Sequence, residues 1–228
     1  MFCPEPLPRY LRLLPDPGRR GHYRLEELRP GTPRLEGYVR FVCVSDTHQQ
    51  TAALILPEGD VLIHAGDFTN GGHREEIKSF CRWLGSCHFA EKVVIAGNHE
   101  LPFDRGYMES MGSLGYSQLQ IEPREDLPGL LGNCIYLQDT ATEVKGFKVY
   151  GSPWQPAFCD WAFNLCERSQ LREKWEQIPP DTDILITHGP PQGFCDVVPH
   201  FGNVGCPELS KAVQRVRPMA HVFGHIHE

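Results

Sequence analysis

Side chains that bind metal ions follow five short apolar runs of this sequence. The runs are FVCVS, VLIHAG, KVVIAG, DILIT and HVFG. The polar residues that come directly after them are, in chain order, Asp46, His48, Asp67, Asn98, His99, His188, His225 and His227. In an α/β sheet, loops beyond the carboxyl ends of the strands aim their side chains at a common point. The sequence therefore predicts one polar site with the ligand types of a metal centre.

The prediction of a metal centre rests on the whole set of residues, because each residue alone has a simpler explanation. A single aspartate or histidine after a strand is more often a turn former or a helix cap than a ligand. The chain has only 11 histidines, however, and five of them occur in this set. Imidazole-rich shells suit zinc, iron or manganese, whereas magnesium and calcium prefer more oxygen ligands.

The apolar runs also indicate the elements that must position these residues. Mostly buried strands are expected at VRFVCV, VLIHA, KVVIA, CIYLQ, FKVYG, DILIT and HVF. Helical spacing occurs at Ile77, Phe80, Cys81 and Leu84, at Leu209, Ala212, Val213 and Val216, and more weakly at Leu171, Trp175 and Ile178. Alternating strands and helices predict an α/β fold with helices outside a pair of sheets. We also expect CIYLQ and FKVYG to form an antiparallel hairpin.

Length and composition predict one folded domain and a short additional segment. The chain has 228 residues, of which 40% are hydrophobic and 22% are charged, which is ordinary globular usage. Residues 1–37 are rich in proline and arginine, and we expect them to form a flexible tail. Residues 38–228 are expected to form the domain.

Net charge and cysteine usage restrict the partners and the compartment. The formal net charge of −7 argues against a nucleic-acid polymer or an anionic membrane as the main partner. The first residues contain no apolar stretch that would suit a signal peptide or a membrane span. The nine cysteines are odd in number and include no Cys-x-x-Cys pair, which favours reduced thiols. We therefore expect a cytoplasmic protein, and the sequence indicates no particular protein partner.

The motifs Asp-x-His, Gly-Asp, Gly-Asn-His-Glu, His and Gly-His-x-His, in this order, resemble those of the calcineurin-like metallophosphoesterase superfamily. The resemblance spans residues 40–228. The segments FVCVSDTH, VIAGNHE, ITHGPP and HVFGHIHE are similar to those of the vertebrate metallophosphoesterase domain-containing subfamily. It implies a layered α/β/β/α sandwich of mixed sheets. Relatives continue past the position of Glu228, so we expect a sandwich that is shortened at its C-terminus.

The resemblance also implies a role for each residue of the site. Two divalent or trivalent transition-metal ions are expected, with manganese favoured and iron or zinc as alternatives. Their ligands would be Asp46, His48 and His227 for the first ion, and Asn98, His188 and His225 for the second. Asp67 would bridge them, because two cations about 3.5–4 Å apart need a shared anionic oxygen. A hydroxide bridging the metals would attack phosphorus, and His99 would donate a proton or stabilise charge at the leaving oxygen.

The residues beside the motifs favour a small phosphodiester as the substrate. Protein phosphatases of the superfamily carry phosphate-clamping arginines there, whereas this chain has Phe68, Thr69, Asn70 and Ala96. A diester has one negative charge and needs less clamping, and the resemblance makes a cyclic nucleotide the leading candidate. Several aromatic residues could stack a nucleobase or pack in the core, and we favour the core for them: Phe68, Phe103, Trp154, Phe158 and Trp161.

Two other functions are also compatible with the sequence. The chain ends one residue after His227, which motivates a second hypothesis: a metal-binding scaffold or interaction protein with weak or vestigial catalysis. A phosphoprotein phosphatase is the third hypothesis.

His64 and His221 lie in strand-like runs and are expected to be core residues or supports for ligands, and His73 is expected to start a helix in contact with solvent.

Overall fold

The computed structural model describes residues 10–15, 23–28, 32–121 and 126–227. The chain divides into two compact units, Met1–Tyr38 and Val39–Glu228. In the first unit, strand β1 (Tyr10–Pro15) pairs with β2 (Tyr23–Leu28) in antiparallel orientation. Residues 1–9, 16–22 and 29–31 of the expected tail lie outside the described residues, so its flexibility stays a prediction.

Two four-stranded sheets form the second unit. The first sheet is parallel, in the order β3 (Phe41–Val44), β4 (Val61–Ala65), β5 (Glu91–Ile95) and β6 (Ile135–Tyr136). The second sheet is mixed, in the order β14 (Ala220–Val222), β11 (Ile184–Thr187), β8 (Phe147–Ser152) and β7 (Thr140–Val144). In this sheet β8, β11 and β14 are parallel, and β7 is antiparallel to β8.

The predicted hairpin between the CIYLQ and FKVYG runs is wrong in its first strand. Strand β8 pairs with Thr140–Val144, whereas the CIYLQ run contributes β6 to the other sheet. The reason is the turn, because Val144 and Phe147 face each other across only two residues, Lys145 and Gly146. Both have positive φ, 53° and 82°, and two such residues form the turn that best matches the twist of a hairpin. Lys145 and Gly146 therefore select the strand directly before them.

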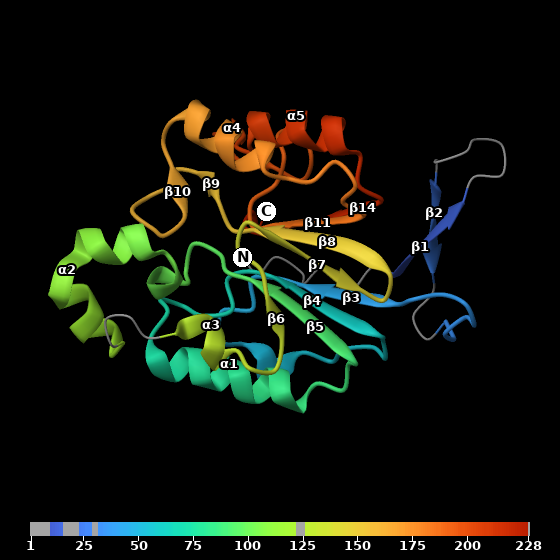
Figure 1. Ribbon diagram of the computed structural model, residues 1–228, viewed down its shortest axis with the longest axis horizontal. Helices are drawn as coiled ribbons and strands as arrows, with labels where there is room; N and C mark the ends of the chain where they lie inside the picture. The colour runs from blue at the N-terminus through green and yellow to red at the C-terminus, as the bar shows by residue number, and fades with distance from the viewer. Residues whose placement is uncertain (1–9, 16–22, 29–31, 122–125, 228) are drawn as a thin grey trace. The chain divides into compact units, whose positions relative to one another are not determined.

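Helices cover the outer faces of the two sheets (Figure 1). Helices α1 (Arg74–Ser86) and α3 (Leu127–Leu130) lie on the first sheet, and α4 (Arg168–Glu176) and α5 (Pro207–Val216) lie on the second, whereas α2 (Arg105–Leu119) lies to one side of both (Figure 1). Short elements connect them: η1 (Thr51–Ala53), η2 (Leu101–Phe103), β9 (Gln155–Pro156), β10 (Asn164–Leu165), β12 (Val197–Val198) and β13 (Gly202–Asn203). The predicted periodicities of α1, α4 and α5 are confirmed, since each helix buries its apolar stripe.

Three hydrophobic clusters fill the three spaces between the layers. Ile63 of β4 packs between the sheets with Val149 of β8 and Ile186 of β11. The preceding residue of β4, Leu62, belongs to the cluster that includes the buried residues of α1. A third cluster, which includes Leu185 of β11, joins the second sheet to α4 and α5. Alternate residues of a strand thus face opposite layers, and the α/β/β/α sandwich expected from the motifs is confirmed.

The strand directions bring the five motif-bearing ends together. In the first sheet, β3, β4 and β5 run parallel, so their carboxyl ends reach one edge. In the second sheet, β11 and β14 also run parallel to each other. No helix in the described residues is both long and apolar enough to cross a bilayer. Every cysteine in the described part of the chain is a free thiol.

Candidate metal centre

The loops that carry the predicted ligands are tightly bent and bonded to one another. Asp46, His48, Asp67 and His225 all have positive φ, at 53°, 40°, 55° and 73°. For residues other than glycine this conformation is uncommon, and it clusters at functional sites. Backbone N–H groups of Asp46 and His48 donate to the carbonyl oxygens of Gly66 and Asp67 at 2.9 and 3.0 Å. The loops after β3 and β4 are therefore fixed against each other.

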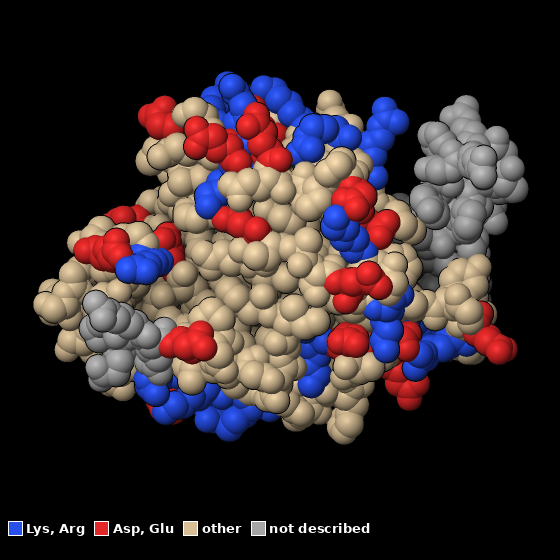
Figure 2. Space-filling view, viewed as in Figure 1, with Lys and Arg blue, Asp and Glu red and all other residues tan. Residues whose placement is uncertain are grey.

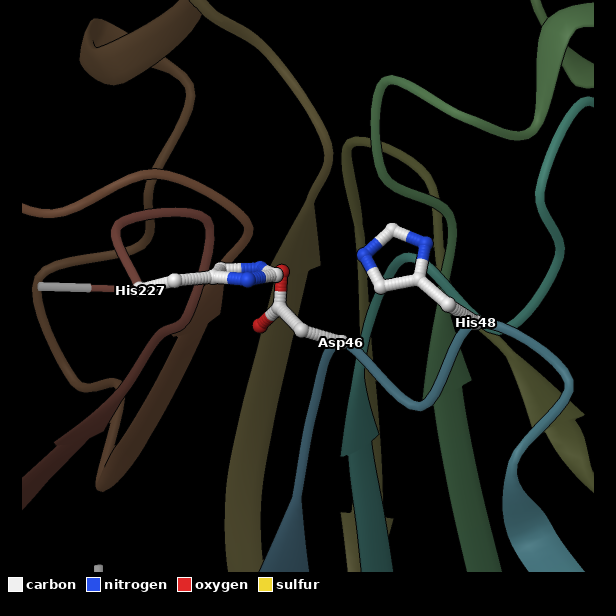
Figure 3. A group of neighbouring side chains, drawn as sticks. All are labelled: Asp46, His48 and His227. Carbon is white, nitrogen blue, oxygen red and sulfur yellow. The ribbon is translucent and has the colours of Figure 1, made fainter. Parts of the chain in front are cut away.

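The predicted side chains form three overlapping groups that could hold a metal ion. The groups are Asp46, His48 and His227; His48, Asp67 and His99; and Asp67, His188 and His225, with ligand atoms in each group within 4.8 Å of one another. Figure 3 shows the first group, in which His48 and His227 approach Asp46 from opposite sides. Because His48 and Asp67 are each shared by two groups, the three form one continuous cluster.

Asn98 completes the set of residues that the sequence pointed to. Its Oδ1 atom lies 3.0 Å from Nε2 of His188, and the side chain is buried. The following residue, His99, donates its backbone N–H to Oδ1 of Asp67 at 2.9 Å. The structure thus brings all eight sequence-derived residues to one place, although they come from both sheets.

Three histidines of the cluster are held in one tautomer by the backbone. Nδ1 of His48, His99 and His188 lies 3.1, 2.7 and 2.9 Å from the carbonyl oxygens of Thr69, Asn70 and Ala65, respectively. A carbonyl oxygen only accepts hydrogen bonds, so Nδ1 carries the hydrogen in each ring. Nε2 then faces the cluster, at 3.7, 3.9 and 3.3 Å from Oδ2 of Asp67. This is how histidine ligands of metals are commonly held, with the other ring nitrogen donating to an acceptor.

The carboxylates of the cluster are anionic at neutral pH. Burial alone would raise the pKa of Asp67, but the positive charge and the hydrogen bond of His188 outweigh it and lower that pKa. The pKa of Asp46 is also lowered, since the His227 hydrogen bond and the His188 charge outweigh burial. Burial acts in the opposite direction on His188, yet Asp67 raises the pKa of that histidine to about 9. In the metal-free chain, Asp67 thus stabilises the positive charge of protonated His188. A metal ion bound beside Asp67 would replace this charge and release the proton.

Glu100 connects the loops beneath the cluster, a role that was not predicted for it. Its carboxylate accepts from the backbone N–H groups of Asp67, Thr69 and Gly97 at 2.8, 2.8 and 2.6 Å, and from Oγ1 of Thr69 at 2.8 Å. Burial, followed by the charge of Asp67, raises its pKa to about 8. The available sequence signal was its position as the last residue of the Gly-Asn-His-Glu motif.

The remaining histidines with sequence-based expectations lie where they were expected. His64 is fully buried, packs edge-to-face on Phe80, and lies 3.0 Å from Oγ1 of Thr47 through Nε2. His221 pairs with Oγ1 of Thr187 at 2.8 Å. His73 is exposed and caps the start of α1. None of the three belongs to the metal-binding groups of the described residues.

The candidate aromatic residues divide into a core set and a pair at the site. Phe68 and Phe103 are buried, and the indole of Trp154 donates to Asp139 at 2.8 Å while packing against the core. In contrast, the ring of Trp161 lies on His99 with centroids 4.2 Å apart. Phe158 is 61% exposed, and its ring centroid is 6.1 Å from that of His225. The core assignment is therefore wrong for Phe158 and Trp161, because their loop runs along the cluster.

Comparisons with known proteins agree with the motifs and the fold. The calcineurin-like phosphoesterase family matches residues 39–228. The chain is 54% identical over 204 residues to metallophosphoesterase domain-containing protein 1 of Homo sapiens and of Mus musculus, which covers 86% of this chain and 63% of each relative. It is 41% identical over 218 residues to UPF0046 protein T07D4.2 of Caenorhabditis elegans, covering 90% of this chain and 55% of the relative. The chain thus spans 63% of the length of the first two relatives and 55% of the third.

A solved crystal structure shares the fold at low sequence identity. It superposes with a TM-score of 0.55 and 14% identity, covering 82% of this chain and 83% of its own. At this identity the likeness concerns the fold alone.

Proposed function

Because the chain belongs to the calcineurin-like phosphoesterase family, we propose that it is a metal-dependent phosphodiesterase. The observation that carries the proposal is the environment of Asp67, whose Oδ2 atom lies within 4 Å of Nε2 of three histidines. A carboxylate oxygen among imidazole nitrogens is the donor arrangement that two neighbouring cations share.

The donor set fits two transition-metal ions. We assign Asp46, His48 and His227 to the first ion, and Asn98, His188 and His225 to the second, with Asp67 between them. The fit rests on the fixed histidine tautomers and on the anionic carboxylates. Manganese is the favoured metal, with iron or zinc as alternatives, since nitrogen-rich shells suit these ions. When bound, such a pair supplies Lewis acidity to the phosphoryl oxygens and an activated water.

His99 is the proposed proton donor to the leaving oxygen. Its Nδ1–H is held by the Asn70 carbonyl, so only Nε2 is available for exchange. The ring must therefore be protonated at both nitrogens to donate from Nε2. The neighbouring Trp161 ring restricts its rotation. His99 thus has a fixed orientation with Nε2 directed at the cluster, which is the geometry that general acid catalysis by this ring needs.

The proposed substrate is a small diester that carries an aromatic group, and a cyclic nucleotide is the leading candidate. The exposed Phe158 ring beside His225 and the Trp161 ring on His99 support an aromatic group. Lysine and arginine side chains on the face shown in Figure 2 are interspersed with acidic ones. For example, Nζ of Lys211 lies 2.9 Å from Glu208. This mixture favours a small substrate over a nucleic-acid polymer, which is held by a continuous basic surface.

A paired assay tests the proposal. The manganese-supplemented protein should hydrolyse bis(p-nitrophenyl) phosphate faster than p-nitrophenyl phosphate, and should also hydrolyse 2′,3′- or 3′,5′-cyclic nucleotides. Metal content and turnover are measured for the parent, Asp67→Asn and His99→Ala, with Asp181→Asn on the surface as the control. A preference for the monoester would favour a phosphatase.

The alternative function is a metal-binding scaffold with weak or vestigial catalysis. One observation bears on it: the side chain of His227, which is assigned to the first ion, is 58% exposed. Metal uptake by the parent together with turnover equal to that of the metal-ion blank would establish this alternative and exclude the phosphodiesterase.

A further inference from the structure

Within the described residues, the ring of His225 makes no hydrogen bond, whereas three other histidines of the cluster do. His48, His99 and His188 each donate Nδ1–H to a backbone carbonyl. The His225 backbone N–H donates to the Asp46 carboxylate, but within residues 32–121 and 126–227 its ring makes no hydrogen bond. A metal-bound imidazole normally donates its other N–H to an acceptor. His225 therefore lacks the support that the other three histidines have.

Gln155 supplies a buried acceptor that is also unpaired. Its side chain is buried, and Oε1 has no hydrogen-bond partner in the described part of the chain. Nε2 of Gln155 donates to Oδ1 of Asn164 at 3.2 Å. Asn164 in turn donates through Nδ2 to the carbonyl oxygens of Phe158 and Cys159 at 3.0 and 3.1 Å.

The orientation of the Gln155 amide follows from this chain of contacts. The Phe158 and Cys159 carbonyls can only accept, so Nδ2 of Asn164 must point toward them and Oδ1 must point toward Gln155. Gln155 must then direct Nε2 to Asn164, which leaves Oε1 on the opposite side. Reversing the amide would place two acceptors against each other. Oε1 is thus fixed as an unpaired, buried acceptor, which is costly unless a donor reaches it.

The unpaired acceptor and the unpaired ring face the same residue, Gly189. A methyl group on the Gly189 α-carbon would lie 4.0 Å from Oε1 of Gln155 and 3.9 Å from Cδ2 of His225. Cδ2 lies between Cγ and Nε2 and opposite the Nδ1–Cε1 bond, so Nδ1 is on the side of the ring that is away from this point. Phe158, from the same segment as Gln155, packs edge-on toward the His225 ring.

We infer that Gln155 positions His225 by accepting the hydrogen of its Nε2 through Oε1, which leaves Nδ1 for the metal ion. This inference rests on the proposed metal centre and adds a residue outside it. It matches a ring without a hydrogen bond to a buried acceptor without one, both judged within the described residues. Gln155 is also bonded through Asn164 to the loop that carries Phe158, so the network ties a metal ligand to the rim of the site.

Metal affinity tests the inference without any substrate. Calorimetric titration of the metal-free protein with Mn²⁺ is carried out for the parent, Gln155→Met and Gln155→Glu. Gln177→Met, an exposed glutamine on the end of α4, is the matched control. Loss of such a support typically lowers metal affinity about 10- to 100-fold. We expect Gln155→Met to weaken one of two binding events by at least about tenfold. Gln155→Glu keeps an acceptor toward His225 but turns a second acceptor toward Oδ1 of Asn164, so it should restore only part of the affinity.

Nuclear magnetic resonance provides a readout that a general loss of stability would not imitate. In the zinc-loaded protein with ¹⁵N-labelled histidine, His225 should show a slowly exchanging Nε2–H signal, assigned by its loss in His225→Gln. The signal should be absent in folded Gln155→Met and present in Gln177→Met. Circular dichroism confirms folding of each variant.

Unchanged affinity together with a retained Nε2–H signal in Gln155→Met would overturn the inference. A protein that binds metal normally but does not hydrolyse diesters would contradict the proposed function and leave the role of Gln155 intact. A parent chain that takes up no ion would overturn the metal centre itself and this inference with it.

Discussion

The Glu100 carboxylate accepts a hydrogen bond from the backbone N–H of Asp67 at 2.8 Å. The residue at the centre of the proposed metal pair is thus held from beneath by a second, fully buried carboxylate. The same Glu100 also binds the Thr69 and Gly97 N–H groups, so it joins the loops after β4 and β5.

Replacing Glu100 with glutamine should destabilise the protein. The amide NH₂ would face one of the backbone N–H donors, and one buried donor would lose its acceptor, at a cost of about 1–3 kcal/mol. Urea unfolding measures the change in the free energy of unfolding, with Glu109→Gln on the exposed face of α2 as the control. A shift no larger than that of the control would show that the connection contributes nothing to stability.

Removing the His99 imidazole should slow turnover while leaving metal binding in place. Loss of a positioned general acid commonly lowers the rate by about 10²- to 10⁴-fold. We expect His99→Ala to lower kcat within this range and to keep the metal content of the parent. Turnover and metal analysis are measured on the same preparation. Parent-like kcat would exclude His99 as the proton donor, and loss of metal would instead make it a ligand.

The contribution of His64 to the stability of the metal-free protein should fall as the pH decreases from about 6.5 toward 4. Burial lowers the pKa of His64 to about 4, so over this range the unfolded chain binds a proton that the folded chain does not. The free energy of unfolding then decreases by about 1.4 kcal/mol per pH unit for this one group. Because the stability is present above the unfolded pKa, neutral pH retains it fully.

His64→Asn should reduce the slope of the free energy of unfolding against pH by the contribution of one proton, about 1.4 kcal/mol per pH unit. His88→Asn, at an exposed position, should leave this slope unchanged. Urea unfolding at several pH values between 7.5 and 4.5 provides the comparison. Equal slopes in the parent and His64→Asn would mean that His64 is not held neutral by burial.

Shortening Phe158 should reduce selectivity for esters that carry a nucleobase. Thymidine 5′-(p-nitrophenyl phosphate) and methyl p-nitrophenyl phosphate share a leaving group and differ in the group that would meet the Phe158 ring. Stacking of a base on an aromatic side chain is worth about 1–3 kcal/mol. We therefore expect the ratio of the two kcat/KM values to fall at least about fivefold in Phe158→Ala.

Phe194→Ala is the matched control, because Phe194 is similarly exposed at 63% and its ring makes no aromatic contact with a cluster histidine in the described residues. Its ratio should equal that of the parent. If Phe158→Ala also keeps the parent ratio, the exposed ring does not contact the substrate.

The sequence by itself determined the residue set of the site and the layered fold. Asp46 and His48 are separated by one residue, as are His225 and His227, and each pair follows an apolar run. Such spacing is local, so it can be recognised without coordinates. The buried stripes of α1 and α5 follow from the same kind of local period. The hairpin was predicted with the wrong partner because two turn residues outweighed the apolar run that preceded them.

Only the tertiary structure decided how those residues are oriented and supported. His188 is fixed by the carbonyl oxygen of Ala65, 123 positions away in the chain. Gln155 and His225 meet at Gly189, from three separate segments. Phe158 and Phe68 have the same side chain, yet one is exposed at the site and the other is buried. Hydrogen-bond partners and burial depend on which segments the fold brings within a few ångströms of one another, and residue type and spacing do not contain that information.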